Sequence, residues 1–256
     1  MDEHLAATEV VARSAGPRGE LVLRRAGEHY ELISNGVFLM DSRDGTSERA
    51  LVRRALATLE ATGEGRRRDG RTLLLGGLGM GFSLLEALAS ERVAAVTVVE
   101  VEADVIAWHR THLRAVGQGG IDDPRVTLVA DDLVAWLRRG EADDRGRGPF
   151  DAICLDVDNG PDWTVTASNA WLYGDQGLAL LRATLAPGGV LAVWSSSAAP
   201  GFLERLRRVF GDAEAAEIPS RVPGAPDVIF LARRGGGREE LLSGSCRPCS
   251  QGAGDR

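Results

Sequence analysis

Short hydrophobic runs recur along most of the chain, each followed by a stretch with helical periodicity. Almost continuous hydrophobicity is typical of parallel strands that are covered on both faces. We expect such strands at 72–76, 94–100, 125–130, 150–156 and 190–194. Helices are expected at about 80–90, 102–115, 133–139, 174–185 and 201–211, with two last strands at 214–219 and 227–233. This order predicts an α/β fold with a doubly wound, mostly parallel, Rossmann-like sheet.

The region before this domain shows an alternation of apolar and polar residues instead. Asn35-Gly36 separates two apolar runs and is a strong signal for a two-residue hairpin. We expect a small antiparallel sheet of two or three strands, then a helix from about Thr46 that ends at Gly63. The predicted organisation is a flexible N-terminus at 1–18, a small β-hairpin region plus helix at 19–66, a Rossmann-like cofactor-binding catalytic domain at 67–235, and a disordered tail at 236–256.

The first strand of the main domain runs directly into a glycine-rich turn, LLLGGLGMG. Gly76, Gly77 and Gly79 suit a turn that visits positive φ and lets a ligand approach the backbone. The N–H groups at the start of the next helix favour a polar or anionic ligand group. Glu100 ends the following strand, where a carboxylate can accept hydrogen bonds from both hydroxyls of a ribose. The pattern predicts a nucleoside-binding pocket.

Acidic residues also follow the strand at 125–130, and the carboxyl ends of parallel strands form the usual ligand site of such a sheet. We expect Asp131 to contact the cofactor and count Asp132 as a second cofactor-binding candidate. An aspartate just before a helix can instead be the N-cap of that helix. This alternative is open for Asp132, because a helical pattern begins at Leu133.

The strand at 150–156 ends in a polar loop, Asp-Val-Asp-Asn-Gly-Pro-Asp-Trp. The sequence fits a loop that closes over a substrate, with Trp163 excluding water. Asp156 is the catalytic candidate, because its carboxylate could orient an amine, stabilise a developing positive charge or relay a proton. Asp158 and Asn159 are candidates for binding the substrate. An aspartate-rich surface loop is the alternative.

Composition narrows the function classes only modestly. The chain has 256 residues and a formal net charge of −7, which disfavours nucleic-acid binding. The first residues lack the pattern of a secretory signal and no run is long enough to span a membrane, so we expect a cytoplasmic enzyme. Cys154 is expected in the core, and Cys246 and Cys249 in the tail. His109 and His112 are expected on the surface, and no metal site is predicted.

Several of these segments together resemble the spermidine synthase-like (polyamine aminopropyltransferase) family, which has the fold of class I methyltransferases that use S-adenosylmethionine. The resemblance runs from about 32 to 233 and includes LLLGGLGMG, VTVVEVEADVIAW, VTLVADDLVAWL and FDAICLDVDN. It implies that Asp131 meets the amino group of an adenine and that Asp156 is the catalytic aspartate. It also implies aminopropyl transfer from decarboxylated S-adenosylmethionine to an amine, with release of methylthioadenosine.

The acceptor side departs from the family pattern, so alternatives stay open. Thr46-Ser-Glu-Arg49 stands where the family carries a tyrosine and a His/Gln-Glu pair. The cofactor is therefore expected to be S-adenosylmethionine or decarboxylated S-adenosylmethionine, with methyl transfer as the alternative reaction. A non-catalytic nucleoside-binding protein and a nicotinamide-dependent oxidoreductase are further alternatives. We expect a small amine as the substrate, and the open edges of the small N-terminal sheet are compatible with a homodimer.

Overall fold

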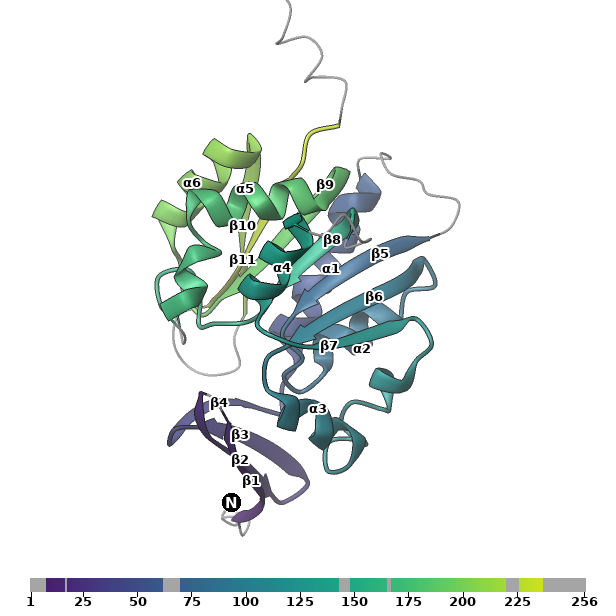
Figure 1. The fold of residues 1–256 in the computed structure, drawn as a ribbon, viewed down its shortest axis with the longest axis vertical. Helices are drawn as coiled ribbons and strands as arrows, with labels where there is room; N and C mark the ends of the chain where they lie inside the picture. The colour runs from purple at the N-terminus through teal and green to yellow at the C-terminus, as the bar shows by residue number, and fades with distance from the viewer. Residues whose placement is uncertain are drawn as a thin grey trace, which may run out of the picture.

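Figure 1 shows the computed structural model of the chain, which describes residues 8–16, 18–61, 70–142, 148–164, 167–219 and 226–236. A small antiparallel sheet near the N-terminus lies at one end of a larger, mostly parallel sheet. The predicted α/β class, with a Rossmann-like sheet preceded by a small β-sheet, is confirmed. Cys246, Cys249 and nearly all of the predicted tail lie outside the described residues.

The N-terminal sheet is a four-stranded antiparallel meander. Its strands are β1 (Thr8–Gly16), β2 (Gly19–Ala26), β3 (His29–Ser34) and β4 (Val37–Asp41). Asn35 and Gly36 connect β3 to β4 with φ of 49° and 79°, so the predicted hairpin is confirmed. The expected flexible N-terminus is wrong for residues 8–16, which form the edge strand β1. Most side chains of β1 are small or polar, so this strand carries no clear hydrophobic alternation.

The larger sheet has seven strands in the order β10-β11-β9-β8-β5-β6-β7. Its strands are β5 (Arg71–Gly76), β6 (Val93–Glu100), β7 (Val126–Ala130), β8 (Phe150–Leu155), β9 (Leu185–Ser195), β10 (Asp212–Ile218) and β11 (Asp227–Arg233). Strands β5 to β9 are parallel, whereas β11 is antiparallel to β9 and β10. From β5 the chain proceeds outward through β6 and β7, and then on the other side through β8 and β9. The strand order therefore reverses beside β5, where sheets of this kind bind ligands.

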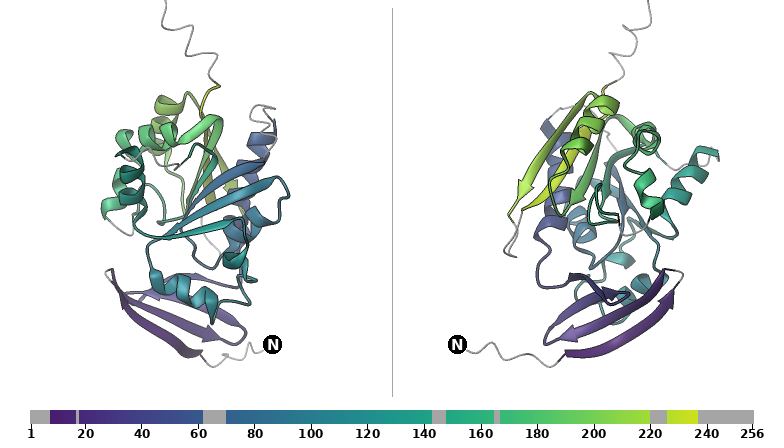
Figure 2. Two further views of the ribbon diagram at one scale, coloured as in Figure 1. Left: turned by 45° about the vertical axis from the view of Figure 1, so that its right-hand side comes forward. Right: turned by 90° about the vertical axis from the view of Figure 1, so that its left-hand side faces the viewer.

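Helices cover both faces of the larger sheet (Figure 2). They are α1 (Thr46–Ala61), α2 (Phe82–Leu88), α3 (Ala103–Arg110), α4 (Leu133–Ala142), α5 (Asp175–Thr184) and α6 (Pro200–Phe210). Leu73 and Leu75 of β5 pack with α1, α2 and α3, whereas Leu74 packs with α4, α5 and α6, as the alternation of a strand requires. Leu23 and Leu32 of the N-terminal sheet join the first of these layers, so the two sheets share a core.

Strand β9 already begins at Leu185, before the predicted start at 190, and so includes Pro187, Gly188 and Gly189. The pairing of β9 with β8 shifts register here, and Gly188 has a φ of 76°. The N–H of Gly188 donates to the carbonyl of Arg234 at 3.0 Å, and the N–H of Arg234 donates to the carbonyl of Gly189 at 2.8 Å. These hydrogen bonds hold the irregular segment in the sheet, so the chain bulges without leaving it.

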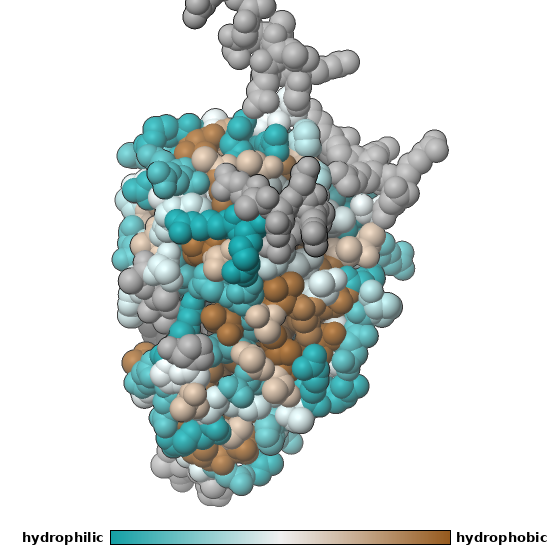
Figure 3. Space-filling model, viewed as in Figure 1, coloured by the Kyte–Doolittle hydropathy of each residue, from teal (hydrophilic) through white to brown (hydrophobic). Residues whose placement is uncertain are grey.

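Most large hydrophobic side chains of the described residues are buried, and some are grouped on the face that Figure 3 shows. In Figure 3 they collect over β6 and β7, at a part of the sheet that no helix covers in Figure 1. Cys154 is buried in β8, as expected, and burial raises the pKa of its thiol to about 12. Within the described residues, no helix combines the length and the apolar character needed to cross a membrane.

Candidate active site

A cavity of about 800 Å³ lies between the N-terminal sheet and the carboxyl ends of the parallel strands. Its walls come from β4, the start of α1, the glycine turn after β5, and the residues that follow β6, β7 and β8. A cavity of this size holds ligands as large as a nucleoside with an attached chain. Most of the predicted site residues line it, namely Gly77, Gly79, Glu100, Asp131, Asp156, Asp158 and Asn159.

The glycine turn requires glycine at the two positions that line the cavity. Gly77 has a φ of 91°, and a β-carbon there would lie 2.4 Å from the carbonyl oxygen of Asp156. Gly79 has a φ of 50°, and a β-carbon there would lie 2.9 Å from the sulfur of Met40. The turn is therefore packed tightly between the loop after β8 and the N-terminal sheet, with its backbone left open to a ligand.

We expect Gly77→Ala to destabilise the fold more than Gly36→Ala does. Both alanines would be held at positive φ, which costs about 1 kcal/mol. Nothing lies within 4 Å of a β-carbon added to Gly36, whereas one added to Gly77 meets the Asp156 carbonyl. Overpacking of this kind adds about 1–3 kcal/mol. Urea unfolding measures the two losses, and equal losses would contradict the tight packing of the turn.

Glu100 is the last residue of β6, and its carboxylate contacts the backbone of the glycine turn. Its Oε2 accepts a hydrogen bond from the N–H of Leu78 at 2.8 Å, and its Oε1 accepts one from the N–H of Glu102 at 2.8 Å. Burial raises the pKa of Glu100, and the backbone donors and Arg18 oppose this rise. The N–H of Gly79 also stabilises this carboxylate, which lines the cavity and keeps a lone pair that can accept a hydrogen bond from a ribose hydroxyl.

The adjacent residues Asp131 and Asp132 differ in role. Asp132 Oδ1 accepts a hydrogen bond from the N–H of Ala135 at 2.9 Å, which makes Asp132 the N-cap of α4. Its Oδ2 pairs with Arg18 at 3.3 Å, and Asp132 is not among the residues that line the cavity. The structure therefore gives Asp132 the capping role and not the predicted cofactor contact. Asp131 lines the cavity and forms an ion pair with Arg139.

Two other predicted site residues also lie outside the cavity lining, Gly76 and Trp163. A β-carbon on Gly76 would lie 2.8 Å from Cδ2 of Leu133, so Gly76 packs against the first residue of α4 beneath the turn. Trp163 is 66% exposed, and its backbone N–H donates to the Gly160 carbonyl at 3.2 Å. The loop after β8 thus turns outward beyond Gly160, so Trp163 does not shield the cavity from water as predicted.

The first part of that loop is fixed against its surroundings. Asp158 is buried and accepts a hydrogen bond from Tyr173 Oη at 3.0 Å. Burial and the Asp158 charge raise the pKa of Tyr173, which therefore stays a donor. The carbonyl of Asn159 accepts hydrogen bonds from the N–H and the Oγ of Ser196, at 2.9 and 2.8 Å. These contacts hold in place the residues that follow Asp156 in the loop, Asp158 and Asn159.

Asp156 lies near two further carboxyl groups, those of Glu48 and Asp227, and we call these two residues the acidic wall. Neither of them was predicted from the sequence as a site residue. The N–H of Asp156 donates to the Gly76 carbonyl at 3.0 Å, which continues the pairing of β8 with β5. Burial raises the pKa of Asp156 to about 8, and the charges of Glu48 and Asp227 act in the same direction. Glu48 lies in the first turn of α1 and Asp227 begins β11, and burial raises the pKa of both. A cation beside Asp156 would lower its pKa again.

The raised pKa of Asp156 predicts a pH dependence of stability. Between about pH 4 and pH 8 the unfolded chain gives up a proton that the folded protein keeps on this residue. Stability therefore falls as the pH rises, by at most about 1.4 kcal/mol per pH unit from this group. Asp156→Asn removes this loss, so its unfolding free energy should exceed that of the parent protein at pH 8 and approach it at about pH 4. Urea unfolding at both pH values measures this gap, and a pH-independent gap would contradict the assignment.

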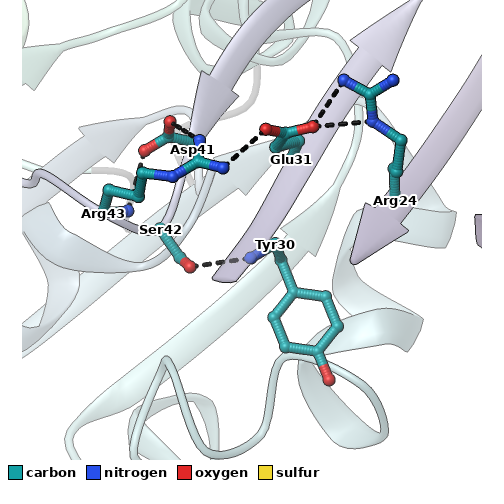
Figure 4. Close-up of polar contacts among 6 residues, drawn as sticks. All are labelled: Arg24, Tyr30, Glu31, Asp41, Ser42 and Arg43. Carbon is teal, nitrogen blue, oxygen red and sulfur yellow. Dashed lines mark hydrogen bonds and ion pairs between the residues drawn. The ribbon is translucent and has the colours of Figure 1, made fainter. Parts of the chain in front are cut away.

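An ion-pair network next to this wall fixes the segment that leads into α1 (Figure 4). Arg43 donates to Glu31 at 2.8 Å and to Asp41 at 2.5 Å, and Arg24 pairs with the other oxygen of Glu31 at 2.6 Å. Although burial opposes it, the two arginines lower the pKa of Glu31, and the carboxylates raise the pKa of Arg43. Arg43 lines the cavity, but its charge is already balanced by two carboxylates.

His109 is buried, contrary to expectation, whereas His112 is exposed as predicted. The Nε2–H of His109 donates to the carbonyl of Gly79 at 2.9 Å. The predicted helix extends to about 115, whereas α3 ends at Arg110. The residues after α3 fold back, so that Gly117 packs on the imidazole ring of His109. Among the residues that the structure describes, no group of three or more His, Cys, Asp or Glu side chains could hold a metal ion.

Comparisons with known proteins agree on one family. Residues 33–199 match the spermine/spermidine synthase domain. The polyamine aminopropyltransferase of Mycobacterium tuberculosis is 32% identical over 197 residues, which cover 76% of this chain and 34% of that relative. Polyamine aminopropyltransferase 1 of Streptomyces coelicolor is 39% identical over 127 residues, which cover 49% of this chain and 22% of the relative. The chain thus spans about a third or less of the length of these two curated relatives.

Solved structures share the fold. The crystal structure of spermidine synthase from Thermotoga maritima has a TM-score of 0.68 at 17% identity, covering 88% of this chain and 73% of that chain. A spermidine synthase in complex with the transition state analogue AdoDATO has a TM-score of 0.67 at 17% identity, covering 88% of this chain and 72% of that chain. The shared fold agrees with the domain match, which extends over more than half of the sequence. The chain belongs to the spermine/spermidine synthase family.

Proposed function

We propose that this protein transfers an aminopropyl group from decarboxylated S-adenosylmethionine to a small amine. One observation carries the proposal: Asp156 connects the glycine turn to the acidic wall. Its carbonyl oxygen packs against Gly77, and its carboxyl group is acted on by the charges of Glu48 and Asp227. A nucleoside held by the glycine turn and Glu100 would extend its reactive chain past carboxyl groups that suit ammonium ions.

The charges around the cavity favour a donor that lacks a carboxylate. Arg18 and Arg43 are the cations among the described residues that line the cavity. Arg43 is balanced by its two carboxylate partners, and Arg18 lies at the ribose end beside Asp132. The carboxylate of intact S-adenosylmethionine would face the acidic wall without a counter-charge, which is costly in a buried site. A sulfonium with a primary amine at its end is complementary to that wall.

The residues of the cavity then have separate roles in one displacement. The bound donor supplies an electrophilic carbon next to its sulfonium. Gly77, Gly79 and Glu100 hold the nucleoside and so fix the direction of the carbon–sulfur bond. Asp156, ionised beside the bound cations, orients the amine and accepts its proton as the carbon–nitrogen bond forms and the carbon–sulfur bond breaks. The electron pair of the broken bond stays on sulfur, which gives methylthioadenosine.

The raised pKa of Asp156 supports its role as the proton acceptor. A carboxylate with an ordinary pKa is a weak base compared with an amine, so proton transfer to it provides little driving force. Burial, the largest cause of the raised pKa, makes the carboxylate of Asp156 more basic, and it still acts when bound cations balance the charges of Glu48 and Asp227. We place the cationic part of the acceptor against the same two residues.

We also propose a homodimer, in which a second subunit covers the edges of the N-terminal sheet. Strands β1 and β4 are the edges of the N-terminal sheet. Val10 on β1 and Val37 and Phe38 on β4 are each at least half exposed, which is unusual for large hydrophobic side chains. A second subunit could cover these edges.

The proposal is tested by offering each donor separately with a panel of mono-, di- and triamines. We expect methylthioadenosine and an amine heavier by one aminopropyl group with decarboxylated S-adenosylmethionine, and no product with the intact donor. Mass spectrometry identifies the thioether in each reaction. S-adenosylhomocysteine with a methylated amine would replace the proposed reaction with methyl transfer. Absence of both products, with the donor bound, would support a non-catalytic nucleoside-binding protein.

A further inference from the structure

We propose that His109 is a positioning residue that sets the affinity of the cavity for the nucleoside by holding the glycine turn in its binding conformation. This inference rests on the proposed function only in assuming that a nucleoside binds at the turn. His109 itself lies behind the turn and is not among the residues that line the cavity.

The backbone of the turn is held from two sides. On one side, Glu100 accepts a hydrogen bond from the N–H of Leu78 at 2.8 Å, and the N–H of Gly79 also stabilises its carboxylate. On the other side, the carbonyl of Gly79 accepts the Nε2–H of His109 at 2.9 Å. Gly79 lines the cavity and lies at a φ of 50°, so its carbonyl is part of the backbone conformation that the cavity presents to a ligand. The imidazole therefore holds one end of the turn that lines the nucleoside site.

The imidazole is itself held tightly. It is 2% exposed, and a β-carbon on Gly81 or on Gly117 would lie within 3 Å of a ring atom. Burial lowers the pKa of His109, so the ring is neutral at neutral pH and carries one N–H. Since the carbonyl of Gly79 can only accept, that proton lies on Nε2. The contact is thus a directed hydrogen bond from a fixed donor.

A pair of substitutions separates the hydrogen bond from the packing. Methionine and glutamine have similar size and flexibility, but only glutamine carries a terminal N–H donor. We expect His109→Met to raise the dissociation constant for methylthioadenosine roughly tenfold, which corresponds to about 1.4 kcal/mol. We expect His109→Gln to stay within about threefold of the parent protein. His112→Met, an exposed change near the same helix, should leave the affinity unchanged.

Calorimetric titration gives these constants, and steady-state kinetics gives a second measure. The KM for the donor should rise with the dissociation constant, while kcat at saturating donor stays within about threefold. Equal affinities of His109→Met and the parent protein would overturn the inference and leave the proposed function intact. Absence of any methylthioadenosine binding by the parent protein would instead overturn the nucleoside site itself.

A measurement on the unchanged protein covers the case in which His109→Met does not fold. Nuclear magnetic resonance of the ring nitrogens should show His109 as the Nε2–H tautomer, with a ring proton that exchanges slowly with water. Added methylthioadenosine should slow this exchange further, because coupling between two contacts made to one turn is reciprocal. An Nδ1–H tautomer, or an exchange rate that is indifferent to the nucleoside, would contradict the proposal.

Discussion

Asp156→Asn should lower kcat by a factor of roughly 10² to 10⁴ while leaving the affinity for methylthioadenosine within about threefold of the parent protein. An amide cannot accept the proton that the amine loses, and it cannot balance the positive charge that develops on nitrogen. The nucleoside contacts come instead from the glycine turn and Glu100, which the substitution leaves in place. Initial rates at saturating donor, with methylthioadenosine measured by mass spectrometry, give kcat.

A control comes from the same loop. Asp162 is exposed and is not among the residues that line the cavity, so Asp162→Asn should keep the parent rate. If Asp156→Asn kept more than about a third of the parent kcat, Asp156 would not be the proton acceptor. If both the rate and the nucleoside affinity collapsed, the substitution would have disturbed the turn through the contact between Asp156 and Gly77.

Glu100→Gln should produce the largest loss of nucleoside affinity, about 100-fold in the dissociation constant. A hydrogen bond from a ribose hydroxyl to a charged carboxylate contributes about 1.5–3 kcal/mol, so losing the charge weakens the contact that holds the ribose. The amide also places an N–H₂ group against one of two backbone donors, the N–H of Leu78 or that of Glu102. The melting temperature should therefore fall as well.

Calorimetry with methylthioadenosine measures this loss, and Glu91→Gln is its control. Glu91 is exposed and precedes the opposite end of the same strand, so its substitution should change neither affinity nor stability. An unchanged affinity in Glu100→Gln would mean that the ribose does not lie at the end of β6. The proposed orientation of the donor would then have to be reversed or abandoned.

The part of the site that could be predicted from the sequence is the part with local signatures. A glycine turn after a buried strand, and an acid at the end of the next strand, are each defined by a few neighbouring residues. Asp156 could be predicted for the same reason, because an abrupt change from hydrophobic to acidic residues marks the end of β8. The parallel sheet and its helices followed from the alternation of hydrophobic runs with helical patterns.

The rest depends on contacts between distant segments. Glu48 and Asp227 are far from each other and from Asp156 in sequence, and they meet Asp156 only in the folded protein. The burial of His109 depends on Gly81 and Gly117, which lie on either side of it in sequence and leave space for its ring. Asp132 shows the limit of local reasoning, since cofactor contact and helix capping have the same sequence signature and only the bond to Ala135 decides between them.

The most direct test of the account is a crystal structure of the protein soaked with methylthioadenosine. We expect the ribose hydroxyls on the carboxylate of Glu100, the adenine beside Asp131, and the sulfur facing the cavity side of Asp156. Density for the nucleoside at any other place on the protein, or its sulfur turned away from Asp156 and the acidic wall, would contradict the central claim that one cavity aligns the donor with this carboxylate.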